Sequence, residues 1–182
     1  MADGRHILLL TGRPGVGKTT VVRRVAEILD GWRLAGFYTE EIREDGVRKG
    51  FRGVALDDGA EAVIAHVDRP AQPRVSSYGV DVAGIDELAS ATLRVDERQA
   101  DAVLLDEIGK MECLASEFLD SVTDLLDSPL PIVATVAQKG TGLIAAVKNR
   151  PDALLWEVTP ENRDRLPTEI AAWLQDHRVT IH

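Results

Sequence analysis

Cysteine, aromatic residues and long apolar runs are all scarce in this sequence of 182 residues. The single cysteine, Cys113, excludes an intramolecular disulfide framework and a zinc site built on cysteine ligands. No apolar run reaches the roughly 18 residues of a membrane-spanning helix. The apolar run that follows the first residues ends early at a glycine loop, so it does not read as a signal peptide. We therefore expect a protein of the reducing cytoplasm without a membrane partner.

Positive charge is also in short supply. The sequence holds 21 Lys and Arg against 30 Asp and Glu, for a formal net charge of −9. Nucleic acids and anionic membranes both favour clustered Lys and Arg, so a broad nucleic-acid surface is excluded, although a local basic groove is not. The length suits one domain with one core. We expect a single domain spanning residues 1–182, and a monomer.

The order of apolar runs predicts an α/β fold. Ile7–Leu10 is a short run of the kind that is buried on both faces of a parallel sheet. A glycine loop follows, and then apolar residues recur at helical spacing up to Leu29. Beyond residue 67, the patterns predict strands at 78–82, 102–105, 131–136 and 153–158, and helices at 85–93, 118–126, 143–147 and 166–174.

The segment from residue 36 to 67 has a different pattern, with β-rich stretches around 37–39, 54–56 and 63–65. Asp45-Gly46 and Asp58-Gly59 fall between these stretches, and Asp-Gly favours a tight hairpin turn. We predict a small antiparallel meander inserted at about 36–67 after the first α/β unit. Residues 68–77 are expected to form a loop.

One motif has a specific chemical meaning. The residues Gly12-Arg13-Pro14-Gly15-Val16-Gly17-Lys18-Thr19 match the pattern G-x-x-x-x-G-K-[ST] at every fixed position. Glycines let such a loop bring backbone N–H groups against phosphate oxygens, and the following helix presents its unpaired N–H groups to the same anion. Lys18 is expected to reach the β- and γ-phosphates, and the Thr19 hydroxyl to bind Mg²⁺. The motif lies between a predicted strand and a predicted helix, where this mechanism requires it.

A phosphate loop needs a metal-binding carboxylate at the end of another core strand. Asp106 and Glu107 directly follow the apolar run 102–105. We expect Asp106 to hold Mg²⁺ opposite Thr19, directly or through water, and Glu107 to orient and deprotonate an attacking water. The alternative is that the pair only ends the strand as a solvated turn.

Other polar residues are weaker candidates for the same site. Thr135 or Gln138, near the end of the third core strand, could contact the γ-phosphate or the water. Hydrolysis also calls for a cation beyond Lys18 to stabilise the transition state. Arg13, Arg43, Arg48 and Arg163 are the candidates, of which Arg13 and Arg163 are favoured; each is otherwise an ordinary surface charge.

The chain as a whole resembles the cancer-related nucleoside-triphosphatase family of P-loop enzymes. The segments that carry the resemblance are TGRPGVGKTT (11–20), GFYTEEIR (36–43), YGVD (78–81), DEIGKME (106–112) and TPENRD (159–164). The resemblance implies a RecA-like, mostly parallel sheet flanked by helices, and hydrolysis of several nucleoside triphosphates with Mg²⁺. It also implies Lys18 and Thr19 at the phosphates and the metal, Asp106 on the metal and Glu107 near the water. Thr20 and Asn162 fall within these segments and are expected at the nucleotide.

Other functions remain open from the sequence alone. A nucleoside or nucleotide kinase has the same loop but usually also a mobile lid with several arginines, and the segment 139–150 has few cations for such a lid. A regulatory GTP switch is disfavoured because Asn149-Arg150-Pro151-Asp152 departs from the guanine-reading N-K-x-D. A nucleic-acid motor is disfavoured by size and by the net charge of −9.

Overall fold

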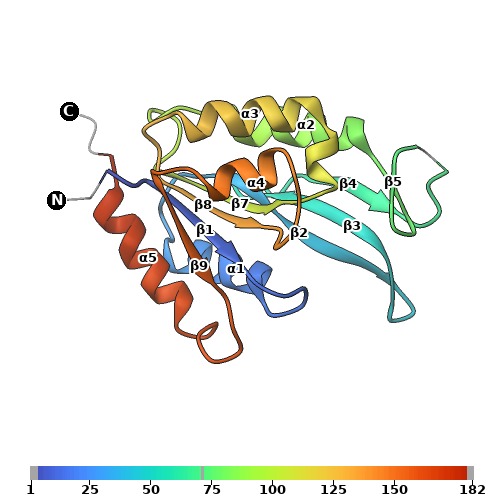
Figure 1. Ribbon diagram of the computed structural model, residues 1–182, viewed down its shortest axis with the longest axis horizontal. Coiled ribbons are helices and arrows are strands. Elements are labelled where there is room, and N and C mark those ends of the chain that lie inside the picture. Colours follow the sequence, from blue (N-terminus) through green and yellow to red (C-terminus); the bar gives the residue numbers. More distant parts are fainter. Residues whose placement is uncertain (1–3, 71, 180–182) are drawn as a thin grey trace.

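A computed structural model of the protein describes residues 4–70 and 72–179. Within these residues, nine strands form one sheet in the order β5-β6-β4-β3-β2-β7-β8-β1-β9, with helices on both faces (Figure 1). The parallel strands are β1 (Ile7–Thr11), β2 (Leu34–Glu44), β7 (Ala102–Ile108), β8 (Ile132–Val136) and β9 (Ala153–Glu157). The antiparallel strands are β3 (Val47–Ala55), β4 (Glu61–His66), β5 (Arg74–Val75) and β6 (Tyr78–Val80).

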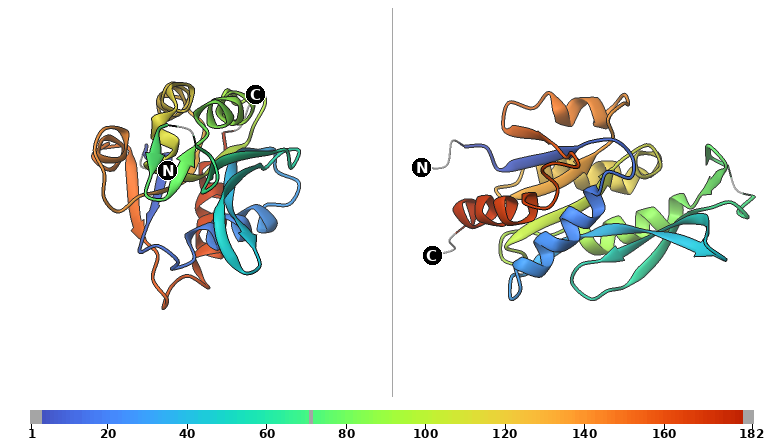
Figure 2. Two further views of the ribbon diagram at one scale, coloured as in Figure 1. Left: turned by 90° about the vertical axis from the view of Figure 1, so that its right-hand side faces the viewer. Right: turned by 90° about the horizontal axis from the view of Figure 1, so that it is seen from below.

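The helices form a layer on each face of the sheet. They are α1 (Lys18–Ile28), α2 (Val82–Leu93), α3 (Ser116–Leu126), α4 (Leu143–Lys148), α5 (Leu166–His177) and the short 3₁₀ helix η1 (Glu112–Leu114). Helices α1 and α5 pack together on one face (Figure 2), and α2 and α3 pack together on the other. Among the described residues, no helix is both long enough and apolar enough to cross a membrane.

Strand β1 shows why the apolar run of the sequence becomes a central strand. Its side chains Ile7 and Leu9 join the core under α2 and α3, whereas Leu8 and Leu10 join the core under α1 and α5. None of the four is exposed. A strand that is buried on both faces consists of apolar residues at consecutive positions, as the sequence predicted.

The order of the parallel strands sets the distance between the phosphate loop and the acid pair. Strand β8 lies between β1, which carries the phosphate loop, and β7, which carries Asp106. The loop and the acid pair therefore approach each other across an intervening strand at the carboxyl ends of the parallel strands. This arrangement confirms the predicted RecA-like α/β core.

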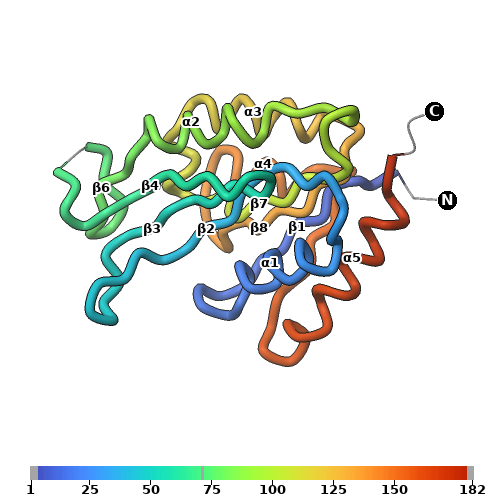
Figure 3. The backbone as a smooth tube through the Cα atoms, turned by 180° about the vertical axis from the view of Figure 1, so that it is seen from behind, coloured from blue at the N-terminus to red at the C-terminus, as the bar shows by residue number. Residues whose placement is uncertain are grey.

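The predicted antiparallel strands are confirmed, but they extend the core sheet. The first residues of β2, Leu34–Phe37, pair in parallel with β7, and the rest of β2 pairs antiparallel with β3. The meander is thus continuous with the parallel half, and the β2–β3 hairpin projects on the side away from α5 (Figure 3). Asp45-Gly46 forms its turn, as predicted.

Several element boundaries differ from the sequence prediction, and two of the differences lie between residues 68 and 85. Helix α2 begins at Val82 instead of residue 85, because Asp81 caps it by accepting a 3.0 Å hydrogen bond from the Gly84 N–H. The stretch 68–77 contains a short strand, β5, which pairs with β6. Neither difference moves the phosphate loop or the acid pair.

Candidate active site

The phosphate loop connects β1 to α1, as its sequence predicts. Gly12 has no room for a side chain, since a Cβ there would lie 2.8 Å from the carbonyl oxygen of Val158. Helix α1 begins at Lys18, and no side chain caps its first turn. The N-terminus of an 11-residue helix therefore offers its backbone N–H groups to an anion.

The residues of the loop divide between the cavity and the core. Pro14, Gly15, Gly17, Lys18, Thr19 and Thr20 line a cavity beside the loop. Val16 is 7% exposed and packs in the core under α1 and α5, so it anchors the loop. The Lys18 ammonium donates a 2.7 Å hydrogen bond to the carbonyl oxygen of Gly12, which holds the side chain across the loop.

The cavity has a volume of about 770 Å³, within the range of small-molecule sites. The phosphate loop forms one wall, and the acid pair with the following segment up to Glu112 forms another. The β2–β3 hairpin closes the far side with Thr39, Glu41 and Phe51. One cavity therefore brings together the phosphate loop, the acid pair and the meander.

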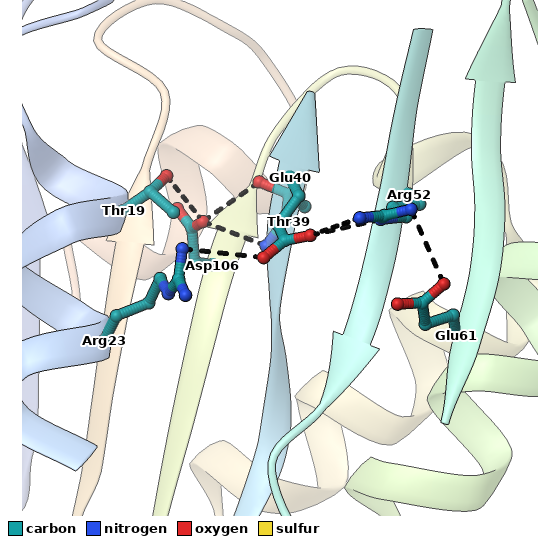
Figure 4. Close-up of polar contacts among 7 residues, drawn as sticks. All are labelled: Thr19, Arg23, Thr39, Glu40, Arg52, Glu61 and Asp106. Carbon is teal, nitrogen blue, oxygen red and sulfur yellow. Dashed lines mark hydrogen bonds and ion pairs between the residues drawn. The ribbon is translucent and has the colours of Figure 1, made fainter. Parts of the chain in front are cut away.

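Asp106 is held from both sides by threonine hydroxyls. Its side chain is buried, and its Oδ2 accepts hydrogen bonds from the Thr19 hydroxyl at 2.8 Å and from the Thr39 hydroxyl at 2.9 Å. The Thr39 backbone N–H donates to the same oxygen at 3.2 Å, and the Thr135 hydroxyl donates to Oδ1 at 2.7 Å. Four donors therefore fix the orientation of one carboxylate (Figure 4 shows Thr19 and Thr39).

Two further carboxylates meet over Gly109. A Cβ on that glycine would lie 2.6 Å from Oε1 of Glu107 and 2.9 Å from Oε2 of Glu112. Burial raises the pKa of Glu107, the nearby Asp106 raises it further, and Lys18 opposes the shift. Burial also raises the pKa of Glu112, and with the charge of Glu107 brings it to about 8. The carboxyl groups of Glu107 and Glu112 therefore keep their protons to a higher pH than an exposed glutamate does.

The oxygen donors at the loop fit a magnesium ion. Mg²⁺ prefers oxygen ligands and is usually held by one or two carboxylates together with substrate phosphates and water. Thr19 and Asp106 present a hydroxyl and a carboxylate oxygen 2.8 Å apart beside the phosphate loop. Within residues 4–70 and 72–179, no three His, Cys, Asp or Glu side chains form a separate metal cluster.

A chain of ion pairs links α1 to the meander next to Asp106. Arg23 of α1 lies 3.5 Å from Glu40 of β2, and Arg52 of β3 lies 2.8 Å from the same carboxylate (Figure 4). Arg52 also contacts Glu61 of β4 at 3.6 Å. These pairs hold the start of the hairpin against the helix that follows the phosphate loop.

The remaining predicted residues lie outside the cavity, apart from Arg48. Arg163 donates to the carbonyl oxygen of Val16 at 3.0 Å and so contacts the loop from outside. Asn162 uses its amide within its own loop, accepting from the Thr159 N–H and donating to the Glu157 carbonyl. Arg13 and Gln138 are exposed and do not line the cavity.

Arg43 and Arg48 belong to the β2–β3 hairpin. Both pair with Glu41, Arg43 at 2.6 Å and Arg48 at 3.0 Å. Arg48 also donates to the Tyr78 hydroxyl at 3.0 Å, and it lines the far end of the cavity. Both arginines are therefore held by ion pairs with Glu41.

Thr39, Lys110 and Glu112 are among the cavity residues that escaped the sequence reasoning. The only signal was their presence in the segments GFYTEEIR and DEIGKME. Nothing in their spacing from Gly12–Thr19 shows that they face the phosphate loop. Thr39 reaches the site because β2 pairs with β7, and Lys110 and Glu112 follow directly after β7.

Known proteins are similar to this chain along most of its length. The chain matches the NTPase family model over residues 7–171. The nucleoside-triphosphatase THEP1 of Thermotoga sp. (strain RQ2) is 39% identical over 171 residues, covering 94% of this chain and 97% of that protein. The protein of the same name from Thermofilum pendens is 40% identical over 167 residues, covering 90% and 92%.

Two solved structures are similar along the chain. The crystal structure of THEP1 from the hyperthermophile Aquifex aeolicus is 35% identical with a TM-score of 0.84, covering 93% of this chain and 99% of that one. The solution structure of a human cancer-related nucleoside triphosphatase is 33% identical with a TM-score of 0.77, covering 96% and 100%. Both support the α/β fold and its strand arrangement.

Proposed function

The chain belongs to the NTPase family, and from this premise we propose that it is a nucleoside-triphosphatase that releases the γ-phosphate of several nucleoside triphosphates. The observation that carries the proposal is that the phosphate loop faces the acid pair across one cavity. Lys18, Thr19, Asp106 and Glu107 all line that cavity. Relatives named nucleoside-triphosphatase align with nearly the whole chain, which supports the same reaction.

The loop binds and orients the triphosphate. Backbone N–H groups at the start of α1 contact phosphate oxygens, and the helix dipole favours their negative charge. On substrate binding the Lys18 ammonium exchanges the Gly12 carbonyl, 2.7 Å away, for β- and γ-phosphate oxygens. The exchange costs little because both partners are hydrogen-bond acceptors.

Glu107 acts on the attacking water. It accepts a proton as the water oxygen forms a bond to the γ-phosphorus, and the bond from that phosphorus to the β–γ bridging oxygen breaks. The products are the nucleoside diphosphate and inorganic phosphate. The burial that raises the pKa of Glu107 also strengthens its carboxylate as a proton acceptor.

Thr19 and Asp106 would hold Mg²⁺ at the phosphates. When bound there, Mg²⁺ supplies positive charge that offsets the charge of the β- and γ-phosphate oxygens. Asp106 would contribute to this role through its fixed orientation, because Thr39 and Thr135 would still hold it if the Thr19 hydroxyl bound the metal. The oxygen donor set supports this cofactor.

Composition supports the setting of the reaction. The net charge of −9 disfavours nucleic acid and anionic membranes as partners, and a single cysteine is consistent with a reducing cytoplasm. The substrate still finds a local positive site at Lys18 and the helix N-terminus.

A panel of γ-labelled nucleoside triphosphates tests the proposal, with and without Mg²⁺ and with and without nucleoside acceptors. We expect label only as free phosphate, from several nucleotides, and only with Mg²⁺. Lys18→Ala serves as the site control and should weaken phosphate binding. Label on an acceptor would show a kinase instead, and the absence of any release from the wild type would overturn the proposal.

A further inference from the structure

Hydrolysis of the terminal phosphate calls for a cation beyond Lys18. Among the described residues, four cationic side chains line the cavity: Lys18, Arg23, Arg48 and Lys110. Arg13 and Arg163, which the sequence favoured, are not among them. The transition-state cation is therefore to be sought on the other walls of the cavity.

Both cavity arginines are already committed to carboxylates. Arg23 pairs with Glu40 at 3.5 Å and lies over the Tyr38 ring, 4.9 Å from its centroid. Arg48 donates to the Tyr78 hydroxyl and to Glu41, each at 3.0 Å. Moving either side chain toward the phosphate would break contacts that it already makes, although Glu40 would keep Arg52 and Glu41 would keep Arg43.

Lys110 differs from these arginines. In the part of the chain that the structure describes, its ammonium has no hydrogen-bond or ion-pair partner. The residue is exposed and lies in the turn between β7 and η1, directly after Gly109. Because β7 carries Asp106 and Glu107, this turn places a flexible, uncommitted cation on the acid-pair side of the cavity.

That side of the cavity is where added positive charge is most needed. Glu107 and Glu112 bring their carboxyl groups together around Gly109, and both line the cavity. The Glu107 carboxylate, ionised as the proposed base, repels the negative charge of the terminal phosphate. Lys18 approaches from the phosphate loop, so a second cation on the opposite wall would contact oxygens that Lys18 does not reach.

We propose that Lys110 is a catalytic residue that contacts the γ-phosphate oxygens and stabilises the charge that develops on them during hydrolysis. This inference rests on the proposed nucleoside-triphosphatase function. A lysine suits the task, since its ammonium is a compact charge with three donors on a flexible stem. Donors aimed at developing charge act mainly on the transition state, so Lys110 should affect turnover more than nucleotide binding.

The test compares Lys110→Met, which removes the charge and keeps much of the side-chain length, with Lys110→Arg, which keeps the charge. The matched control is Lys139→Met, because Lys139 is also exposed but does not line the cavity. We expect Lys110→Met to lower kcat at least about 10-fold, less than the roughly 100-fold or more for a lost oxyanion-hole donor, because Lys110 is exposed. Affinity for a fluorescent non-hydrolysable triphosphate should change less than about threefold, while Lys110→Arg should recover part of the loss.

Several outcomes would overturn the proposal. Turnover of Lys110→Met within about twofold of the wild type would show that the ammonium does not act in the reaction. An equal loss in Lys139→Met would assign the effect to net charge. A weaker affinity with unchanged kcat would make Lys110 a binding residue only. A wild type that releases no phosphate would instead defeat the proposed function, so the two failures are distinguishable.

Discussion

The Thr19 hydroxyl donates a 2.8 Å hydrogen bond to Oδ2 of Asp106, although 87 residues separate the two positions in the chain. This contact joins the first turn of α1 to the end of β7. It places the two oxygens that suit Mg²⁺ side by side next to the phosphate loop. The contact depends on the sheet order, in which β8 sets the spacing between β1 and β7.

Thr39 should prove to be a positioning residue for Asp106. Its hydroxyl donates to Oδ2 at 2.9 Å, and its backbone N–H donates to the same oxygen at 3.2 Å. Thr39→Val removes the hydroxyl but keeps the shape and the N–H. We expect the Mg²⁺ concentration for half-maximal activity to rise several-fold, with a loss of about 1 kcal/mol in the free energy of unfolding.

Thr39→Ser is the matched control, because it keeps the donor and removes only the methyl group. Titrating Mg²⁺ at saturating nucleotide measures the effect. If both variants showed the wild-type Mg²⁺ dependence, Thr39 would have only a structural role.

Glu107→Gln should separate binding from hydrolysis. An amide keeps the size of the side chain but cannot accept a proton from water, so turnover is expected to fall about 100-fold or more. Nucleotide affinity should be kept or slightly increased, since a carboxylate near the γ-phosphate is removed. Stopped-assay phosphate release and equilibrium nucleotide titration measure the two quantities.

Glu61→Gln is the control for this prediction. Glu61 is exposed, pairs with Arg52 and does not line the cavity. Near-normal turnover in Glu107→Gln would contradict the water-activating role, whatever the control does.

Glu112 should make the stability of the protein depend on pH. Its pKa rises from 4.5 to about 8 because the side chain is buried beside Glu107. The folded state therefore binds the proton more tightly than the unfolded state, and this contribution to stability is present below pH 4.5 and lost as the pH rises through about 8.

Glu112→Gln removes that titration, because the amide stays neutral. The free energy of unfolding of the variant, relative to the wild type, should thus increase between pH 5 and pH 9. Urea denaturation at the two pH values measures the change. A constant difference between the two proteins would show that Glu112 does not titrate with folding in this range.

Gly36→Ala should be strongly destabilising. Gly36 has φ of +100°, and a Cβ there would lie 1.9 Å from the carbonyl oxygen of Leu104 on β7. The strands would have to separate where β2 pairs in parallel with β7, so we expect a loss of more than about 3 kcal/mol in the free energy of unfolding, or no folded protein.

Gly59→Ala is the control, since that turn glycine has φ of +72° and open space around it. A loss of about 1 kcal/mol is expected there. Thermal unfolding compares the two, and equal losses would refute the steric explanation.

Local patterns were enough to predict much of the fold. The apolar run 7–10, the glycine loop and the helical spacing that follows predicted the β1–loop–α1 unit, because each feature depends on residues close in sequence. The Asp45-Gly46 turn was predictable for the same reason. The start of α2 at Val82 was missed, although Asp81 directly before it is a typical N-cap residue.

The sequence by itself determined the phosphate loop and the acid pair, because each is a contiguous motif whose chemistry follows from its residue types. Only the tertiary structure decided what faces them. Pairing of β2 with β7 brings Thr39 to Asp106, and the turn after β7 brings Lys110 and Glu112 to the cavity. Contacts between distant segments also bring Arg163 to the Val16 carbonyl oxygen, on the outer side of the phosphate loop. These positions depend on contacts between distant segments, which no local pattern of residues encodes.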